Sequence, residues 1–185
     1  MRNDGYESAL LGHRALGVQA IVPMSNVELY AAGGIYRRIV DMPADAAVAR
    51  GVTIEGDQGK AIANELDRLK VLPALADGLR WARLTGGAAI VIVADDGGLL
   101  RDPLNLNTIK RIEELKVFDL DDVSATDDRY LDATKSNFGM PERYRVRTAA
   151  TASIDADFLV HESRLIPISG DPLPRRMAAI CGPPP

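Results

Sequence analysis

The chain has 185 residues, of which 46% are hydrophobic and only 5% are aromatic. A chain of this length and composition can bury the mainly aliphatic core of one ordinary domain. Its length excludes a large multidomain enzyme, and its hydrophobic content excludes a disordered chain. The net charge of −4 lacks the basic excess that nucleic-acid-binding domains normally carry. The single cysteine, Cys181, cannot form an internal disulfide, and no apolar run is long enough to span a bilayer. We therefore expect a soluble, intracellular type of protein.

Helical patterns fill the first half of the chain. Residues 1–24 are weakly patterned and are expected to form an N-terminal arm. Ser25 and Glu28 have the spacing of a capping box, in which each side chain accepts a hydrogen bond from the backbone N–H of the other residue. This box predicts a helix from about Asn26, which the glycines at 33–34 should break or bend.

A second helix is predicted from residue 35. Its apolar side chains recur at helical spacing and are expected to pack inside the subunit; they are Ile35, Ile39 and Met42. Pro43 lacks a backbone donor, so it should end or kink this helix, and residues 44–50 can resume it up to Gly51. The β-branched residues at 52–54 predict a short strand.

Residues 60–85 have a strong helical pattern, which Pro73 restarts and the glycines at 86–87 should terminate. The β-branched run at 88–93 predicts a buried strand, and Asp-Asp-Gly-Gly at 95–98 predicts a turn. Further short strands are predicted at 115–120, 143–147, 158–160 and 164–169, with a turn at 170–174. A helical N-terminal half followed by a small mixed or antiparallel sheet indicates an α+β fold.

The segment from Gly56 to Lys60 has some features of a phosphate-binding loop. The motif requires a glycine five residues before Gly59, where the chain has Ile54, and a Ser or Thr after Lys60, where it has Ala61. A loop that enters a helix is therefore the better interpretation, and no cofactor is predicted.

Two histidines, His13 and His161, are the only side chains with an unperturbed pKa near neutrality. His161-Glu162-Ser163 has the His-x-Ser form used by two-histidine phosphoesterases, which need two such tripeptides. The sequence after His13 lacks the hydroxyl group, so a structural histidine at a strand junction is favoured over catalysis. We predict no catalytic and no metal-binding residue.

Charged residues are concentrated in two further segments. Residues 113–132 carry eight acidic and two basic side chains, but their spacing does not match an EF-hand loop, so a solvated acidic face is favoured over a cation site. The carboxylates considered for such a site are Asp119, Asp121, Asp122, Asp127 and Asp128. Arg143, Arg145 and Arg147 alternate along a predicted strand, which fits either a nucleic-acid contact or a charged edge strand that resists aggregation.

Three stretches resemble motifs of a tailed-phage portal protein family, also described as a phage-associated domain of unknown function. The first is an Arg-Ile-Val-Asp helix followed by a proline, within residues 30–46. The second is an Ala-Arg-x-x-Gly-Gly-Ala strand entry at 82–88, and the third is a hydrophobic-His-x-Ser-Arg-hydrophobic strand at 160–165. The residues that carry the resemblance are Tyr30, Arg38, Ile39, Val40, Asp41, Pro43, Arg83, Gly86, Gly87, His161, Ser163 and Arg164.

The resemblance implies a portal subunit, one copy of a ring at a capsid vertex through which DNA passes and to which the tail connects. Residues 25–174 would form its N-terminal, wing-like α+β region. Because family members are more than twice as long, the chain is expected to be truncated, with residues 175–185 as an unstructured tail at the truncation. The implied partners are other portal subunits, capsid, terminase and tail proteins and, non-specifically, DNA; no membrane is implied. The implied location is the virion or the host bacterial cytoplasm.

Two other functions stay open beside this structural, non-enzymatic one. The N-terminal region of the family is also described as anti-CBASS protein-like, which would mean binding or cleavage of cyclic oligonucleotide signals. The missing second His-x-Ser tripeptide argues against cleavage. The remaining alternative is an inactive prophage remnant.

Overall fold

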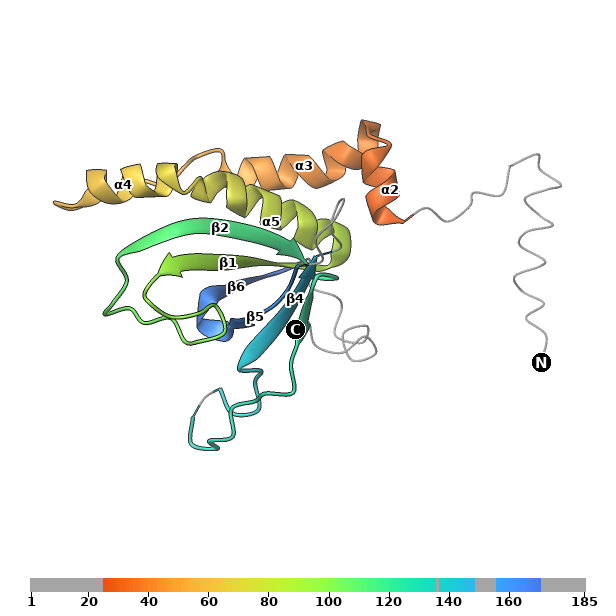
Figure 1. The fold of residues 1–185 in the computed structure, drawn as a ribbon. Helices are drawn as coiled ribbons and strands as arrows, with labels where there is room; N and C mark the ends of the chain where they lie inside the picture. Colours follow the sequence, from red (N-terminus) through yellow and green to blue (C-terminus); the bar gives the residue numbers. More distant parts are fainter. Residues whose placement is uncertain (1–24, 136, 149–155, 171–185) are drawn as a thin grey trace, which may run out of the picture.

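The computed structural model describes residues 25–135, 137–148 and 156–170. Helices occupy the N-terminal half of these residues and two three-stranded antiparallel sheets follow, which confirms the α+β prediction (Figure 1). The helices are α2 (Asn26–Ala31), α3 (Gly34–Val48), α4 (Gly59–Arg68) and α5 (Val71–Thr85). The strands are β1 (Gly87–Asp95), β2 (Arg111–Asp119), β3 (Val123–Ala125), β4 (Arg143–Thr148), β5 (Ala156–His161) and β6 (Leu165–Ser169), with a 3₁₀ turn, η1 (Glu162–Arg164), before β6. The predicted arm, the tail and residues 171–174 of the last predicted turn lie outside the described residues.

The predicted capping box is present at the start of α2. The Ser25 hydroxyl accepts a hydrogen bond from the Glu28 backbone N–H at 3.2 Å, and the Ser25 N–H donates to the Glu28 carboxylate at 2.7 Å. The break after α2 is also as predicted, because Gly33 has a φ of 79°, a left-handed conformation that favours glycine.

Pro43 lies inside α3 and does not end it; the helix continues to Val48, in agreement with the expectation that the residues after the proline can stay helical. Arg80 of α5 explains why both sides stay in one helix. Its guanidinium forms ion pairs with Asp41, at 3.2 Å, before the proline and with Asp45 after it. These contacts offset the one backbone hydrogen bond that the proline removes.

The apolar stripe of α3 does not pack inside the subunit, which corrects the prediction for Ile35, Ile39 and Met42. These side chains are 69%, 55% and 59% exposed. The residue of α3 that is buried is Ala44, which is 1% exposed. A small side chain allows α3 to lie close to α5, and this contact turns the large apolar residues of α3 outward. Periodicity therefore located the stripe but gave the wrong side of the helix.

Helices α4 and α5 form the predicted helical stretch, with a break at Lys70, whose φ of 51° is left-handed. Pro73 lies in the first turn of α5, where a missing donor costs little, and residues 56–58 form a turn that enters α4. Residues 52–54 have no regular secondary structure, so the strand predicted there is wrong; no neighbouring strand pairs with its backbone. Among the described residues, no helix is both long and apolar enough to cross a membrane.

The first sheet, in the order β2-β1-β6, lies between α5 and the second sheet. On one face of β1, Ile90 is 1% exposed and contacts α5, where a Cβ added to Gly78 would lie 3.7 Å from its side chain. On the other face, Val91 packs in a cluster with side chains from β2, β4 and β5; the buried members are Val91, Phe118, Val146 and Val160. Strand β1 is thus buried on both faces, as its continuous apolar run predicts.

The second sheet has the order β3-β4-β5, which makes β4 a central strand. The interpretation of its arginines as a charged edge strand is therefore wrong. Arg145 and Arg147 both pair with Asp157 of β5, at 2.9 and 3.4 Å, and Arg143 pairs with Asp128 at 3.2 Å. Since two carboxylates pair with the three arginines, most of the positive charge that would attract a phosphate backbone is offset.

Replacing Ile90 by alanine should destabilise the domain by about 2–5 kcal/mol, because the change leaves a cavity between β1 and α5. The matched control is Ile62→Ala in α4, where the isoleucine is 44% exposed and alanine favours the helix, so a change below about 1 kcal/mol is expected. Urea unfolding followed by circular dichroism measures the free energy of unfolding of both variants. Equal losses in the two variants would contradict the layered packing.

Candidate functional site

A buried ion pair joins Arg164, in η1, to Asp96, which directly follows β1. The Arg164 side chain has no exposed surface and that of Asp96 has 1%. Nη2 of Arg164 donates to Oδ2 of Asp96 at 2.6 Å, and Nε donates to the backbone carbonyl of Asp102 at 2.8 Å. One guanidinium therefore holds both the start and the middle of loop 96–105, the loop after β1 that contains these carboxylate and carbonyl partners.

The Asp96 carboxylate also receives hydrogen bonds from its own loop. The backbone N–H groups of Asn105 and Gly98 donate to it at 3.0 and 3.1 Å. The Asn105 hydrogen bond has the largest effect on the pKa of Asp96, which is lowered to about 2; the Gly98 N–H and Arg164 lower it further, and burial acts in the opposite direction. The carboxylate is thus ionised in the folded protein, which a buried arginine requires.

The other polar groups of the His-x-Ser-Arg motif hold the same loop. The backbone N–H of Leu104 donates to the Ser163 hydroxyl at 2.8 Å, and the backbone N–H of His161 donates to the carbonyl of Leu100 at 2.9 Å. Together with the Arg164 contacts, these bonds fix loop 96–105 against the junction between β5 and β6. We call residues 161–164 with loop 96–105 the junction site.

The His161 ring is 4% exposed and makes contacts through both nitrogens. Nδ1 accepts a hydrogen bond from the Ser163 backbone N–H at 3.2 Å and lies 2.9 Å from the Ser163 hydroxyl. Nε2 lies 3.5 Å from the Tyr130 hydroxyl and 3.8 Å from a carboxylate oxygen of Glu142. Since Nδ1 is an acceptor, the arrangement fits a neutral imidazole with its proton on Nε2.

Burial has the largest effect on the pKa of His161 and lowers it. The carboxylates of Glu142 and Glu162 raise this pKa, and Arg143 and Arg164 lower it further. Beside the ring, the Tyr130 hydroxyl donates to Glu162 at 2.9 Å, and burial together with this carboxylate raises the pKa of Tyr130 to about 12. Near neutral pH the tyrosine therefore stays a donor.

The geometry at His161 does not resemble a reactive centre. A two-histidine phosphoesterase places two accessible imidazoles on either side of one phosphate, whereas this ring is enclosed and hydrogen-bonded; His13 lies outside the described residues. Within the described ranges, no group of three or more His, Cys, Asp or Glu side chains could hold a metal ion. The carboxylates of the 113–132 segment are thus not gathered into such a site.

The motif residues of α2 and α3 have two different environments. The Tyr30 hydroxyl donates to Asp41 at 2.8 Å, and Asp41 also pairs with Arg37 and with Arg80 of α5. These bonds join α2, α3 and α5. Arg38, Ile39 and Pro43, in contrast, lie on exposed faces of α3 and contribute little to this packing.

The Gly-Gly motif forms the junction between α5 and β1. Gly86 has a left-handed φ of 96° and its N–H donates to the Ala82 carbonyl, which ends α5. The end of β6 lies against the same turn, because the Gly170 N–H donates to the Gly86 carbonyl at 3.0 Å. A Cβ at Gly170 would lie 2.5 Å from the Ala82 carbonyl oxygen, so the close approach requires glycine there. Gly87 begins β1 beside Leu120.

A small hollow lies where α2, α3 and α5 meet. Its volume is about 160 Å³. Its lining is mainly apolar and includes four motif residues; the lining residues are Asn26, Leu29, Tyr30, Tyr36, Ile39, Val40, Arg83 and Leu84. It is smaller than the roughly 300–1,000 Å³ of typical small-molecule sites.

Sequence reasoning missed the partners of the motif. The sequence indicates Asp96 only as a turn residue and gives no signal for Tyr130. The sequence does carry one signal. Asp96 directly follows a strand that is buried on both faces, so its carboxylate lies at the edge of the core, where it needs a partner. Nothing in the sequence indicates that the partner is Arg164, 68 residues later.

Arg164→Met should destabilise the domain by about 3–5 kcal/mol, because it leaves the Asp96 carboxylate buried without its counter-ion. The matched control is Arg145→Met, which breaks a pair whose side chains are 47% and 43% exposed and should cost less than about 1 kcal/mol. Chemical unfolding of both variants checks this. Similar losses would mean that the buried pair does not organise the loop.

His161 should make the domain less stable in acid. Its pKa is lowered in the folded state, so the unfolded chain binds the proton more readily; the stabilising effect is present above the unfolded pKa of about 6.5 and is lost as pH falls below it. Urea unfolding near pH 7.5 and near pH 5.5 should give a smaller pH dependence for His161→Asn than for the wild-type chain. NMR titration of the imidazole, with His13→Gln to assign the signals, measures the pKa directly; a value above about 6.5 would contradict the sign.

A family model described as phage portal protein matches residues 24–181 of the chain. No curated protein matches it significantly. The matched range contains both sheets, α2 to α5 and the junction site.

Proposed function

We propose that this chain, which belongs to the phage portal protein family, is a structural component of the portal through which DNA enters and leaves a phage capsid. The family match over residues 24–181 carries the proposal, because it covers the layered domain as a whole and not an isolated motif. In this function the residues 25–174 act as the wing-like region of a portal subunit. The partners we propose are further portal subunits and the capsid, terminase and tail proteins, with DNA as a non-specific contact in the virion or in the host cytoplasm.

The contacts of the motif residues support a structural function. His161, Ser163 and Arg164 are committed to holding loop 96–105, and Tyr30 with Asp41 joins three helices. A protein that bears mechanical load between a capsid and a tail needs such cross-links between its layers, since they resist local opening.

The charge of the surface also agrees with a DNA conduit. Residues 113–132 contain eight acidic side chains against two basic ones, and the arginines of β4 are paired with carboxylates. A surface of this kind repels phosphate groups, so DNA would move past it without adhering.

We propose that the chain has no catalytic activity of its own, and the anti-CBASS alternative is less well supported. Cleavage of a cyclic oligonucleotide by His161 would require access of a phosphate to the ring, which is 4% exposed and has its Nδ1 occupied by Ser163. A buried, neutral and hydrogen-bonded imidazole is typical of a structural histidine.

Particle incorporation tests the proposed function. The chain, carrying an affinity tag, is expressed together with the phage structural genes of its own locus, and particles are purified by density gradient. Quantitative mass spectrometry should find it at a fixed number of copies per particle, far below the number of capsid subunits, as expected for a component of one vertex.

Arg164→Met is the matched variant, because loss of the domain fold should remove the chain from particles, whereas Arg145→Met should leave incorporation unchanged. Absence of the folded wild-type chain from particles would contradict the proposed function. Hydrolysis of cyclic di- or trinucleotides that is lost in His161→Asn would favour the anti-CBASS alternative instead. A wild-type chain without a cooperative thermal transition would favour the inactive remnant.

A further inference from the structure

Helix α3 presents an exposed apolar surface that is directed mainly away from the buried Ala44 and reaches the hollow beside α5 at one edge. We call Ile35, Tyr36, Ile39 and Met42 the α3 stripe; their exposed fractions are 69%, 50%, 55% and 59%. On a helix of 3.6 residues per turn, the side chains at positions 35, 39 and 42 lie about 140–180° from the buried Ala44. Helix α5 therefore leaves most of the stripe uncovered. Contiguous apolar surface of this kind normally marks an interaction site.

The hollow of about 160 Å³ lies beside this stripe, and Tyr36 and Ile39 belong to both. A cavity of roughly 150 Å³ with an apolar lining has room for one benzene ring. The stripe thus offers a flat apolar surface with a recess of the size of one aromatic side chain. A partner with a single exposed ring would fit it.

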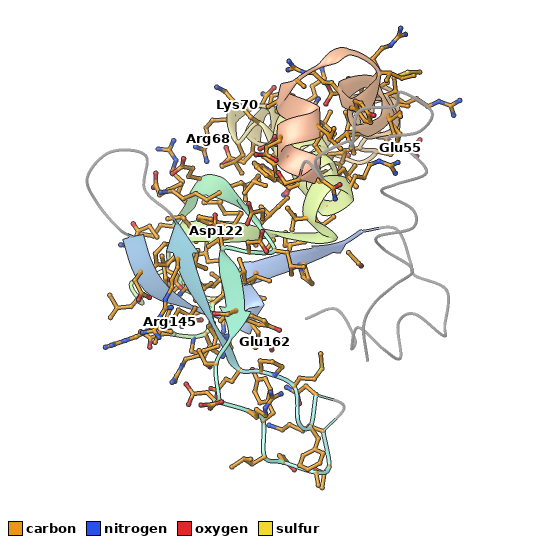
Figure 2. The ribbon with its side chains drawn as sticks, turned by 90° about the vertical axis from the view of Figure 1, so that its right-hand side faces the viewer. Glu55, Arg68, Lys70, Asp122, Arg145 and Glu162 are labelled. Carbon is orange, nitrogen blue, oxygen red and sulfur yellow. The ribbon has the colours of Figure 1, made fainter. Side chains whose placement is uncertain are left out.

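The chain itself carries such a ring at its other end. Loop 126–142 projects from the second sheet at the end of the molecule away from α3, as both views show (Figures 1 and 2). It exposes three large apolar side chains, which we call the loop patch: Leu131, Phe138 and Met140, at 85%, 55% and 51%. Phe138 is the aromatic residue among them.

Hydrogen bonds hold the loop patch in one conformation. The N–H of Gly139 donates to the Tyr130 carbonyl at 2.9 Å, and the N–H of Tyr130 donates to the Met140 carbonyl at 3.1 Å. The Arg129 guanidinium donates to the Gly139 carbonyl at 2.8 Å. Because these bonds already restrict the backbone on both sides of Phe138 and Met140, less conformational entropy is lost when the patch binds.

One charge beside each surface can pair with the other, although the loop also carries the exposed cation Arg129, whose guanidinium is bonded to the Gly139 carbonyl. Arg38 adjoins the stripe on α3 and Asp127 lies at the base of the loop; both are exposed, and neither has an ion pair with another described residue. Opposite charges on two otherwise apolar surfaces favour one orientation of approach.

We propose that the α3 stripe of one copy of this chain binds the loop patch of a second copy, with Phe138 entering the hollow between α2, α3 and α5. The two surfaces lie at opposite ends of the molecule, so they cannot meet within one chain. They form a head-to-tail contact, which leaves one free stripe and one free patch in every dimer and closes into a ring when the rotation allows. The inference rests on the proposed function, because it names the surfaces by which portal subunits would contact one another.

Sedimentation velocity of the purified full chain over a range of concentrations tests the contact. The wild-type chain should associate, and Ile39→Glu and Phe138→Glu should each weaken association about 30-fold or more, as loss of an interface anchor does. Leu106→Glu is the matched control, since Leu106 is 76% exposed but lies in neither surface; it should associate like the wild type. Circular dichroism of each variant checks that the exposed substitutions leave the fold intact.

A mixture of the two variants gives the sharper result. Ile39→Glu keeps an intact loop patch and Phe138→Glu an intact stripe, so an equal mixture should form a 1:1 dimer and nothing larger. A mixture that stays monomeric would overturn the proposal. Self-association that persists in Phe138→Glu but not in Ile39→Glu would mean that the stripe binds the stripe of a second copy. A wild-type chain that is monomeric at every concentration would mean that the stripe binds a different partner. Either result would overturn the proposal.

The association experiment and the particle experiment distinguish failure of the proposed contact from failure of the proposed function. If Ile39→Glu is incorporated into particles and associates like the wild type, the chain is a portal component whose copies meet through other surfaces. If the wild-type chain associates head to tail but is absent from particles, the contact stands and the proposed function fails.

Discussion

The fold depends on one buried ion pair, Arg164 with Asp96, because it lies where the chain changes from one sheet to the other. Strand β5 belongs to the second sheet and β6 to the first, and only η1 separates them. Arg164 ends this turn and reaches the loop that follows β1, so a single guanidinium joins the exit of one strand to the entry of another. An uncompensated charge in this position would cost several kcal/mol, so the pair excludes alternative arrangements of the loop.

The same turn supports a second loop. The Tyr130 hydroxyl donates to Glu162, and the Glu162 N–H donates to the Glu142 carbonyl at 3.0 Å. Residues 161–164 therefore hold loop 96–105 on one side and the base of loop 126–142 on the other. The His-x-Ser-Arg sequence, which resembles half of a catalytic centre, is thus held in structural contacts: the His161 ring, the Ser163 hydroxyl and two nitrogens of Arg164 each have a partner.

The sequence predicted what depends on neighbours along the chain. The capping box of Ser25, the left-handed end of α5 at Gly86 and the buried strand β1 follow from local hydrogen bonding or from a continuous apolar run, and all are present. What depends on distant partners could not be predicted. The α3 stripe was assigned to the interior because periodicity cannot distinguish a core from a docking surface, and only the contact of Ala44 with α5 decides it. The arginines of β4 were compatible with an edge strand because strand order is not encoded locally.

The exposed α3 stripe and the ordered base of loop 126–142 have separate structural causes. Because small residues of α3 face α5, its large apolar residues must face outward, and the domain keeps them there although exposed apolar surface is a cost for an isolated molecule. At the other end, the contacts of Glu162 and Glu142 give loop 126–142 a rigid base, so Phe138 is presented without further ordering. A domain that is stabilised mainly by its two sheets can keep an exposed apolar surface at each end. Repeated copies joined end to end would remove both surfaces from water, and only a closed ring would leave none exposed.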